Sequence, residues 1–223
     1  MNNIKIITLS DHSYFHFLKP MVYSCNLNFK QANMHVVLVN CSESEKEEIE
    51  NMHDNITVIH EKIEFNSDQE KRGYCTNRRA YLINYLRNNS EDIVVWVDAD
   101  SIFRKNCDSL YQHFNSCELT MRGRDHDIED FAAGVIGLGN TPVCYDFSKR
   151  YYDMVKTNDR TWAVDQYKLK ECYFEFKSKI NFISLPYKYC DVWFSDDGVI
   201  WSAKSKNKVS KKYKKEVVKF MEK

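Results

Sequence analysis

The feature that most constrains the fold is an apolar run, Ile93 to Val97, followed closely by two aspartates, Asp98 and Asp100. Its residues are mostly β-branched, which is typical of a strand covered on both faces of a sheet. In open α/β sheets, ligands bind just beyond the carboxyl ends of such strands. Residues two apart in a strand point the same way, so we expect both carboxylates to face one ligand. A divalent cation carrying a phosphate group is the ligand that this pair favours.

The Asp-x-Asp triplet is informative only in its context. About one such triplet is expected by chance in a chain of 223 residues, so the preceding apolar run carries the argument. The alternative for Asp98 and Asp100 is a strand end at which turn-forming aspartates precede a helix that begins near Asn106.

Strand and helix patterns alternate along the first hundred residues, which indicates a succession of βα units. The expected strands are 4–9, 35–40, 56–60 and 93–97, and the expected helices are 13–29, 43–53 and 75–88. This order predicts an α/β fold: one Rossmann-like domain with a mostly parallel central sheet flanked by helices. After Asp100 we expect strands at 117–121, 134–138, 182–184 and 199–201, with helices at 106–114, 141–154 and 163–172.

The composition supports a single domain that acts in the compartment where it is synthesised. Apolar residues make up 43% of the chain and only three prolines and six glycines occur, so a full core is available and no linker is evident. No apolar run is long enough to span a bilayer, and the chain begins with a strand-like segment rather than a signal sequence. None of the eight cysteines forms a Cys-x-x-Cys pair. We therefore expect a cytoplasmic protein with free thiols.

The charge is unevenly distributed although the formal net charge is zero. The segment 204–223 holds nine lysines and two glutamates, so the rest of the chain carries a net negative charge. Apolar residues recur there at helical spacing, which predicts a basic C-terminal helix or tail over 209–223. It either docks as a solvated helix or contacts an anionic membrane surface or an acidic partner. Nucleic-acid binding is disfavoured, because no basic stripe with interleaved aromatic residues runs through the body of the chain.

Five segments in order carry a resemblance to a known family. They are Lys71–Ala80, Val97–Ser101, Phe131–Leu138, Trp162–Gln166 and Ile200–Lys206. In order and spacing they resemble nucleotide-diphospho-sugar glycosyltransferases of the GT-A fold, including small members encoded by large DNA viruses. The resemblance extends to about residue 208. It implies a GT-A domain over 1–208, with a nucleotide-sugar-binding half at 1–101 and an acceptor half at 102–208.

The resemblance implies a metal-dependent glycosyltransferase of the hexosyltransferase type. Such an enzyme moves a hexose or deoxyhexose from a nucleotide sugar, with a UDP-sugar favoured, to a hydroxyl acceptor such as a glycan. Mn²⁺ or Mg²⁺ would stabilise the negative charge that develops on the departing diphosphate. Asp100 is expected to bind the ion directly, and Asp98 to bind the ion through water or the ribose.

Further residues are assigned to the donor. With the two aspartates, the expected donor contacts are Thr8, Ser10, Arg78, Arg79, Ala99, Lys204 and Lys206. By resemblance, Thr8 and Ser10 flank the nucleobase. An arginine guanidinium can fork onto phosphate or base oxygens, although an exposed position on a helix face is the alternative for Arg78 and Arg79. Lys204 and Lys206 are expected to hold the diphosphate as the tail closes over it.

Catalytic and acceptor residues are assigned to the second half. The expected catalytic residues are Asp165, Gln166 and Asp191, and the expected acceptor contacts are Gly134, Trp162, Trp193 and Asp197. Asp165 is a candidate base or electrostatic stabiliser, with helix capping as its alternative and Asp191 as a second candidate base. Gly134 lets the backbone approach a sugar or a neighbouring strand. The tryptophans either stack on sugars or pack in the core.

One departure from the family keeps other functions open. Many relatives place a histidine ligand after the Ile-Trp pair, where this chain has Ser202, a poorer ligand for a transition ion. A non-catalytic sugar-nucleotide-binding domain is therefore one alternative. A haloacid-dehalogenase-like phosphatase is another, with Asp98 as nucleophile, but its aspartate strand normally lies near the N-terminus. A sugar nucleotidyltransferase would need a glycine-rich loop, and residues 8–13 contain no glycine.

Overall fold

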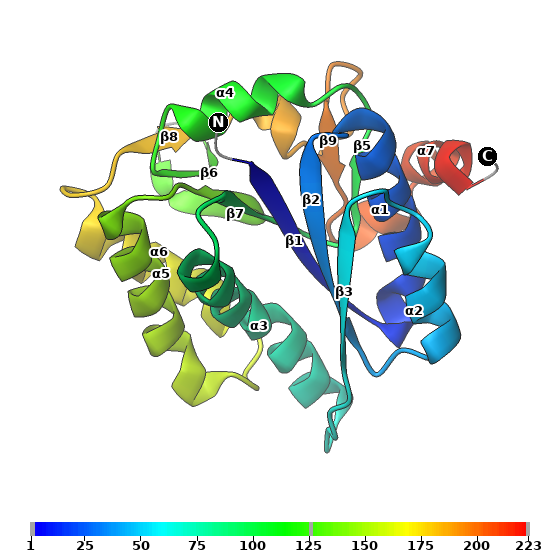
Figure 1. The fold of residues 1–223 in the computed structure, drawn as a ribbon, viewed down its shortest axis with the longest axis horizontal. Helices are drawn as coiled ribbons and strands as arrows, with labels where there is room; N and C mark the ends of the chain where they lie inside the picture. The colour runs from blue at the N-terminus through cyan, green and yellow to red at the C-terminus, as the bar shows by residue number, and fades with distance from the viewer. Residues whose placement is uncertain (1–2, 125–126, 222–223) are drawn as a thin grey trace.

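The computed structural model describes residues 3–124 and 127–221, and a large mixed sheet organises them (Figure 1). Within these residues the sheet has seven strands in the order β3-β2-β1-β4-β7-β6-β8. They are β1 (Ile4–Asp11), β2 (Ala32–Val39), β3 (Ile56–Glu61), β4 (Ile93–Val97), β6 (Leu119–Arg124), β7 (Asp127–Leu138) and β8 (Phe182–Ser184). A separate antiparallel pair joins β5 (Ser101–Phe103) to β9 (Ile200–Ser202).

Strand direction changes halfway across the sheet. Strands β3, β2, β1 and β4 run parallel, whereas β7 joins β4 antiparallel and β6 joins β7 antiparallel. Strand β8 then pairs parallel with β6. The expected mostly parallel α/β sheet is confirmed, and its parallel half brings the carboxyl ends of β1, β2 and β4 to one edge. That edge is where ligands of open α/β sheets bind.

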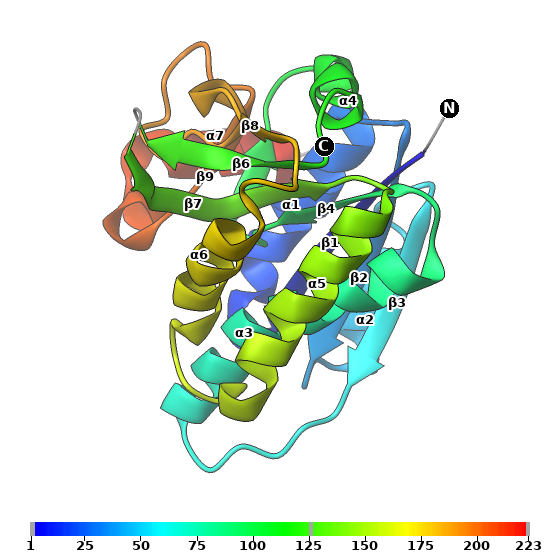
Figure 2. The ribbon, with the colours of Figure 1, turned by 90° about the vertical axis from the view of Figure 1, so that its left-hand side faces the viewer.

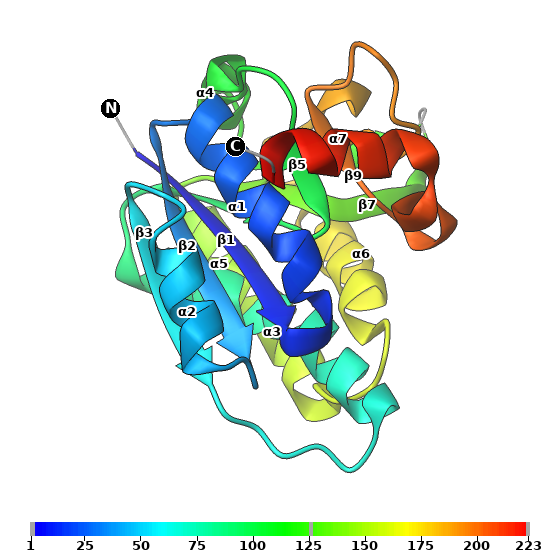
Figure 3. The ribbon, with the colours of Figure 1, turned by 90° about the vertical axis from the view of Figure 1, so that its right-hand side faces the viewer.

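Helices cover both faces of the sheet, as Figures 2 and 3 show from opposite sides. One apolar cluster packs α1 (Phe15–Asn28), α2 (Glu43–Glu50) and α4 (Asp108–Asn115) on one face. A second cluster packs α3 (Asp68–Asn89), α5 (Pro142–Val155) and α6 (Val164–Phe176) on the other. Successive residues of β4 alternate between the two clusters, which accounts for its continuous apolar sequence.

The start of α3 differs from the expected one. The sequence predicts a helix from Cys75, but the helix begins at Asp68 and is 22 residues long. Ser67 caps it by accepting a hydrogen bond from the Glu70 amide at 3.1 Å, and acidic residues fill its first turn. The first turns of α3 are polar and show no apolar periodicity. In this part of the sequence, the Ser67 cap is therefore the signal that marks where the helix begins. Ser42 caps α2 in a capping box with Glu45, and the helix ends at Glu50, three residues before the expected end.

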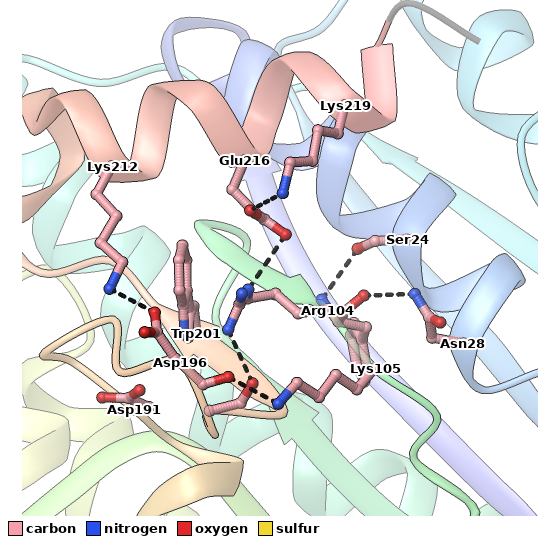
Figure 4. Close-up of polar contacts among 12 residues, drawn as sticks. Ser24, Asn28, Arg104, Lys105, Asp191, Asp196, Trp201, Lys212, Glu216 and Lys219 are labelled. Atoms are coloured by element: carbon pink, nitrogen blue, oxygen red, sulfur yellow. Dashed lines mark hydrogen bonds and ion pairs between the residues drawn. The ribbon is translucent and has the colours of Figure 1, made fainter.

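The C-terminal helix α7 (Lys211–Met221) packs against the body of the protein, as expected of an amphipathic segment (Figures 3 and 4). Arg104 anchors it by donating from Nε to Glu216 Oε1 at 3.1 Å, and the guanidinium lies 3.7 Å from the centre of the Trp201 ring. Lys212 pairs with Asp196 at 3.0 Å. Contact of the lysine-rich outer face with a membrane or a partner stays a prediction.

No helix in the described part of the chain is long and apolar enough to cross a membrane. All eight cysteines lie in described residues and are free thiols, as expected, and all except the half-buried Cys75 are buried. The cytoplasmic location and the division into donor and acceptor halves stay predictions.

Candidate active site

The Asp98–Asp100 segment is a turn rather than a strand extension. Strand β4 ends at Val97, and the Ser101 amide donates to the Asp98 carbonyl oxygen at 3.0 Å, closing the turn. The expected position at the carboxyl end of a buried parallel strand is confirmed. The expected strand alternation is wrong, because the two carboxylates are placed by a turn and by their separate partners.

Asp98 is held by the strand and helix behind it. Its Oδ1 accepts hydrogen bonds from Trp96 Nε1 at 2.8 Å and from Arg79 Nη2 at 3.1 Å. Arg79 comes from α3, is buried, and also donates to the Ala133 carbonyl oxygen at 3.0 Å. The Asp98 carboxylate is thereby fixed in orientation while its side chain keeps partial access to solvent.

Asp100 lies deeper and is only partly satisfied. Its Oδ2 is 2.6 Å from Lys208 Nζ, whereas its buried Oδ1 has no hydrogen-bond partner. Its carbonyl oxygen accepts from the Tyr213 hydroxyl at 2.9 Å and from the Ala203 amide at 3.2 Å. Burial, followed by the nearby Asp98 charge, raises the pKa of the Asp100 carboxyl to about 6 although Lys208 opposes the shift. A buried carboxylate oxygen without a hydrogen-bond partner is an atom that a bound cation could satisfy.

A cleft of about 510 Å³ opens above this turn. Eight of the expected site residues line it: Ser10, Arg79, Asp98, Ala99, Asp100, Trp162, Gln166 and Lys204. The other lining residues were not predicted from the sequence; they are Leu9, Asp11, Tyr14, Arg72, Cys75, Thr76, Trp96, Ala203 and Lys208. The expected nucleotide half and the lysine segment thus meet in one cavity of the size that small-molecule sites have.

Two of the expected donor contacts, Thr8 and Arg78, do not line the cleft. Thr8 is fully buried in β1, and its hydroxyl has no hydrogen-bond partner. Arg78 pairs with Glu61 and lies 3.8 Å from the centre of the Tyr81 ring, so it serves the packing of α3. The side chain of Lys206 lies outside the described residues.

The candidate base Asp165 lies behind Arg79 rather than in the cleft. It is buried in the first turn of α6, its Oδ2 is 3.4 Å from Arg79 Nη1, and its carboxylate accepts no hydrogen bond. Burial raises the pKa of this carboxyl, while the Arg79 charge acts in the opposite direction. Arg79 therefore balances two carboxylates, Asp98 at the cleft and Asp165 behind it.

The carboxylate of the second candidate base, Asp191, is held by hydrogen bonds from the loop that follows it. It is fully buried and accepts hydrogen bonds from the Trp193 amide at 2.8 Å, the Ser195 amide at 2.7 Å and the Ser195 hydroxyl. Asp197 lies in the same loop and accepts from the Tyr187 hydroxyl. Trp193 is 71% exposed and does not line the cleft.

Gly134 serves close packing behind the aspartate turn. A Cβ atom here would lie 2.6 Å from Ser202 Oγ and 3.4 Å from Asp98 Oδ2, and the Gly134 carbonyl oxygen accepts from the Asp98 amide at 2.9 Å. No larger side chain fits at this position without displacing the Ser202 side chain. Ser202 itself is buried.

The opposite wall of the cleft is formed at the start of α6. Trp162 is 64% exposed and precedes Ala163, which has left-handed backbone angles (φ 65°, ψ 5°). This conformation is unfavourable for a residue with a Cβ atom, and here it turns the chain from Trp162 into the helix. Gln166 follows in the first turn and lines the cleft.

The Asp98 and Asp100 carboxylates suit a hard divalent cation whose remaining ligands come from the substrate phosphates and water. No group of three His, Cys, Asp or Glu side chains that could hold a metal occurs among the residues whose placement is described. Asp100 Oδ1 is free, and Asp98 lies near enough to raise the Asp100 pKa. Mg²⁺ and similar ions commonly use one or two carboxylates plus substrate phosphates and water. The two aspartates would hold such an ion only together with a phosphorylated substrate.

Comparisons with known proteins identify the fold. No model of a protein family matches the chain, and no curated protein matches it. Among solved structures, it is similar to the glycosyltransferase GlyE of Streptococcus pneumoniae TIGR4, with a TM-score of 0.59, 16% identity, and coverage of 85% of this chain and 46% of GlyE. The chain thus matches less than half of the length of GlyE.

Two further solved structures are glycosyltransferases. The galactosyltransferase LgtC, solved with donor and acceptor sugar analogues, gives a TM-score of 0.56 at 16% identity, covering 83% of this chain and 74% of LgtC. Mouse xyloside xylosyltransferase 1 gives 0.55 at 12% identity, covering 85% and 89%. The chain has the α/β fold of these proteins, which is the GT-A fold expected from the sequence. The likeness to virus-encoded members stays a prediction.

Proposed function

We propose that this chain is a glycosyltransferase that moves a hexose or deoxyhexose from a nucleotide sugar, with a UDP-sugar as first candidate, to a hydroxyl acceptor such as a glycan. One observation carries the proposal. Asp98 and Asp100 lie in the turn that follows the buried strand β4, at a cleft of about 510 Å³ that also presents Arg72, Lys204 and Lys208. Carboxylates for a cation beside basic groups for a diphosphate are the chemistry that such a donor requires.

The two ends of the donor fit different parts of the cleft. At the end of β1, Ser10 and Asp11 line the cleft, and the exposed Tyr14 ring offers a stacking surface for a base. Arg72 and Lys204 lie in the same cleft and provide positive charge for the diphosphate. We therefore place the nucleoside against β1 and the diphosphate toward the lysine segment.

The chemistry is displacement at the anomeric carbon: the bond to the nucleoside diphosphate oxygen breaks, a bond to the acceptor hydroxyl oxygen forms, and the hydroxyl proton passes to the departing diphosphate or to water. A bound Mn²⁺ or Mg²⁺ would supply Lewis-acid stabilisation of the charge on that leaving group, with Asp100 and Asp98 as its protein ligands. The protein fixes Asp98 through Arg79 and Trp96, so this carboxylate is oriented before the donor arrives. Preorganisation of this kind costs no rearrangement at the moment of reaction.

Trp162 and Gln166 are the acceptor-side groups that line the cleft. We propose that Trp162 offers its exposed ring to a sugar face and that Gln166 hydrogen bonds to a hydroxyl group. Asp165 and Asp191 are buried and fixed by other residues, so we assign them to positioning: Asp165 through Arg79, and Asp191 through its loop. Gly134, Trp193 and Asp197 do not line the cleft, and their expected acceptor contacts stay predictions.

The test is release of nucleotide from a panel of UDP-, GDP- and dTDP-sugars, with and without Mn²⁺. Native protein is compared with Asp100→Asn, and Asp54→Asn is the matched control because Asp54 is exposed in the turn before β3, at the opposite edge of the sheet. We expect Mn²⁺-dependent release from one donor, loss of about a hundredfold or more in Asp100→Asn, and none in Asp54→Asn.

Two other outcomes assign other functions. Nucleotide binding without release, even with glycan acceptors added, would indicate a non-catalytic sugar-nucleotide-binding domain. Hydrolysis of a simple phosphate ester without binding of any nucleotide sugar would indicate the phosphatase.

A further inference from the structure

Lys208 forms an ion pair with Asp100, the carboxylate that the proposed cation would bind. It belongs to a short 3-10 segment, Ser205–Val209, that leads from β9 into α7. Its ammonium group lies 2.6 Å from Asp100 Oδ2 and 3.0 Å from the Tyr14 hydroxyl oxygen, and it sits 4.4 Å from the centre of the Tyr14 ring. The Lys208 side chain is only 17% exposed. An ammonium with three such contacts is a built part of the cleft rather than a solvated surface charge.

The two carboxylate oxygens of Asp100 differ in their contacts. Oδ2 is neutralised by Lys208, whereas Oδ1 is buried without a partner. A divalent cation on Oδ1 would lie within a few ångströms of the Lys208 charge, in a site with little water to screen the repulsion. A cation and an ammonium therefore compete for this carboxylate.

A nucleoside diphosphate changes that competition. Lys208 and Lys204 both line the cleft in which the diphosphate is proposed to lie, so a bound diphosphate offers Lys208 a second anionic partner. Asp100 would then be released from the ammonium and available to the cation. The main chain need not move for this exchange, because the Tyr213 hydroxyl and the Ala203 amide hold the Asp100 carbonyl oxygen independently of Lys208.

We propose that Lys208 is an internal counter-ion of Asp100 that makes binding of the cation and of the nucleoside diphosphate mutually dependent. Without nucleotide, Lys208 keeps the cation site weak. With nucleotide, the ammonium moves to the diphosphate and the cation binds Asp100. The inference rests on the proposed function for the identity of the two ligands, but not on any turnover of a sugar. By linkage, the cation strengthens nucleotide binding by the same factor.

The experiment measures Mn²⁺ binding by the electron paramagnetic resonance signal of the free ion, with and without UDP. The variants are Lys208→Met, which removes the charge and keeps an unbranched side chain, and Lys208→Arg, which keeps the charge. Lys204→Met is the matched control, since it removes one positive charge from the same cleft but from a residue with no described ion pair to Asp100. Asp100→Asn identifies the site.

We expect Lys208→Met to bind Mn²⁺ about tenfold more tightly than the native protein in the absence of UDP. UDP should strengthen Mn²⁺ binding by about tenfold or more in the native protein and by about twofold at most in Lys208→Met. Lys208→Arg should behave as the native protein, and Lys204→Met should change the affinity without UDP by less than Lys208→Met does, because the Lys204 charge acts on Asp100 without a described ion pair. Asp100→Asn should abolish the tight binding of Lys208→Met.

Equal Mn²⁺ affinities in native protein and Lys208→Met, or tight binding in Lys208→Met that survives Asp100→Asn, would overturn the inference. Thermal unfolding of each variant with and without Mn²⁺ gives a second readout, because a ligand that binds the folded state raises the melting temperature. Failure of the donor panel leaves these binding outcomes unaffected, so the proposed enzyme and the proposed counter-ion fail separately.

Discussion

Arg79 Nη2 lies 3.1 Å from Asp98 Oδ1, which ties α3 to the end of β4. The other terminal nitrogen of the same guanidinium faces the buried Asp165. One cation thus fixes a cleft carboxylate and compensates a core carboxylate, and the integrity of the cleft depends on the core behind it.

Arg79→Met should destabilise the protein by about 3–5 kcal/mol, because it leaves Asp165 buried without a cation. Urea unfolding followed by circular dichroism measures the loss. Arg78→Met is the neighbouring control: Arg78 pairs with Glu61 at a half-buried position, so we expect about 1 kcal/mol. The double variant Arg79→Met with Asp165→Asn should regain part of the loss. Equal losses in the two single variants would contradict this account.

The two most exposed tryptophans provide a matched pair for the acceptor wall. Trp162 lines the cleft and Trp193 does not, although both are more than 60% exposed. Trp162→Ala should raise KM for the acceptor about tenfold through loss of a stacking surface, whereas Trp193→Ala should leave that KM within about twofold. Steady-state kinetics at a saturating concentration of the donor found by the panel, with the acceptor varied, measures both. A larger effect of Trp193→Ala would move the acceptor site to the loop that follows Asp191.

Ala163→Gly should stabilise the protein by up to about 1 kcal/mol, because glycine adopts the left-handed conformation of this residue without the cost of a Cβ atom. The entropy of glycine in the unfolded state offsets part of the gain. Thermal unfolding measures the net effect. A drop in the melting temperature would show that the Ala163 methyl group contributes packing that outweighs the backbone cost.

The sequence predicted the sheet because its strands are apolar and β-branched, as in 93–97, and because a βα order restricts the topology. The apolar run at 93–97 also placed Asp98 and Asp100 correctly, just beyond the carboxyl end of a buried strand. The first turns of α3 were missed because they are polar, although Ser67 and Glu70 are a helix-start signal that a closer reading could have used.

The remaining differences concern contacts that only the folded chain creates. Lys208 was missed because its place beside Asp100 depends on how the C-terminal segment folds back, with Tyr213 bonded to the Asp100 carbonyl oxygen. Asp191 attracted a catalytic assignment because it is a carboxylate in an aromatic loop, and no local pattern reveals that backbone amides already hold it. Burial of a polar side chain is a tertiary property that single-sequence patterns do not encode.

Stability should depend on pH through His53, which is buried and accepts a hydrogen bond from the Asn55 amide on Nδ1 at 3.0 Å. Burial lowers the pKa of His53 below its usual 6.5, and burial with the Lys5 charge lowers that of His35. The unfolded state then binds more protons near pH 6, so this stability is present above pH 6.5 and is lost as the pH falls.

His53→Asn tests this dependence, since the Asn oxygen keeps the acceptor for the Asn55 amide without titrating. Between pH 7.5 and pH 5.5 the native protein should lose about 1 kcal/mol more free energy of unfolding than the variant. Urea unfolding at the two pH values gives the comparison. Identical losses would assign the pH dependence to other groups, with His35 first among them.

The eight free thiols are native probes for alkylation footprinting of this protein. Cys75 is the half-buried member and lines the cleft, and burial raises its pKa to about 12, so an alkylating reagent should modify it slowly and only while the cleft is empty. The other seven sulfurs are buried and become available when the sheet and its helices separate. Mass-spectrometric mapping of alkylation in a single sample would therefore report occupancy of the cleft and global opening as two distinct signals, without any label introduced by mutation.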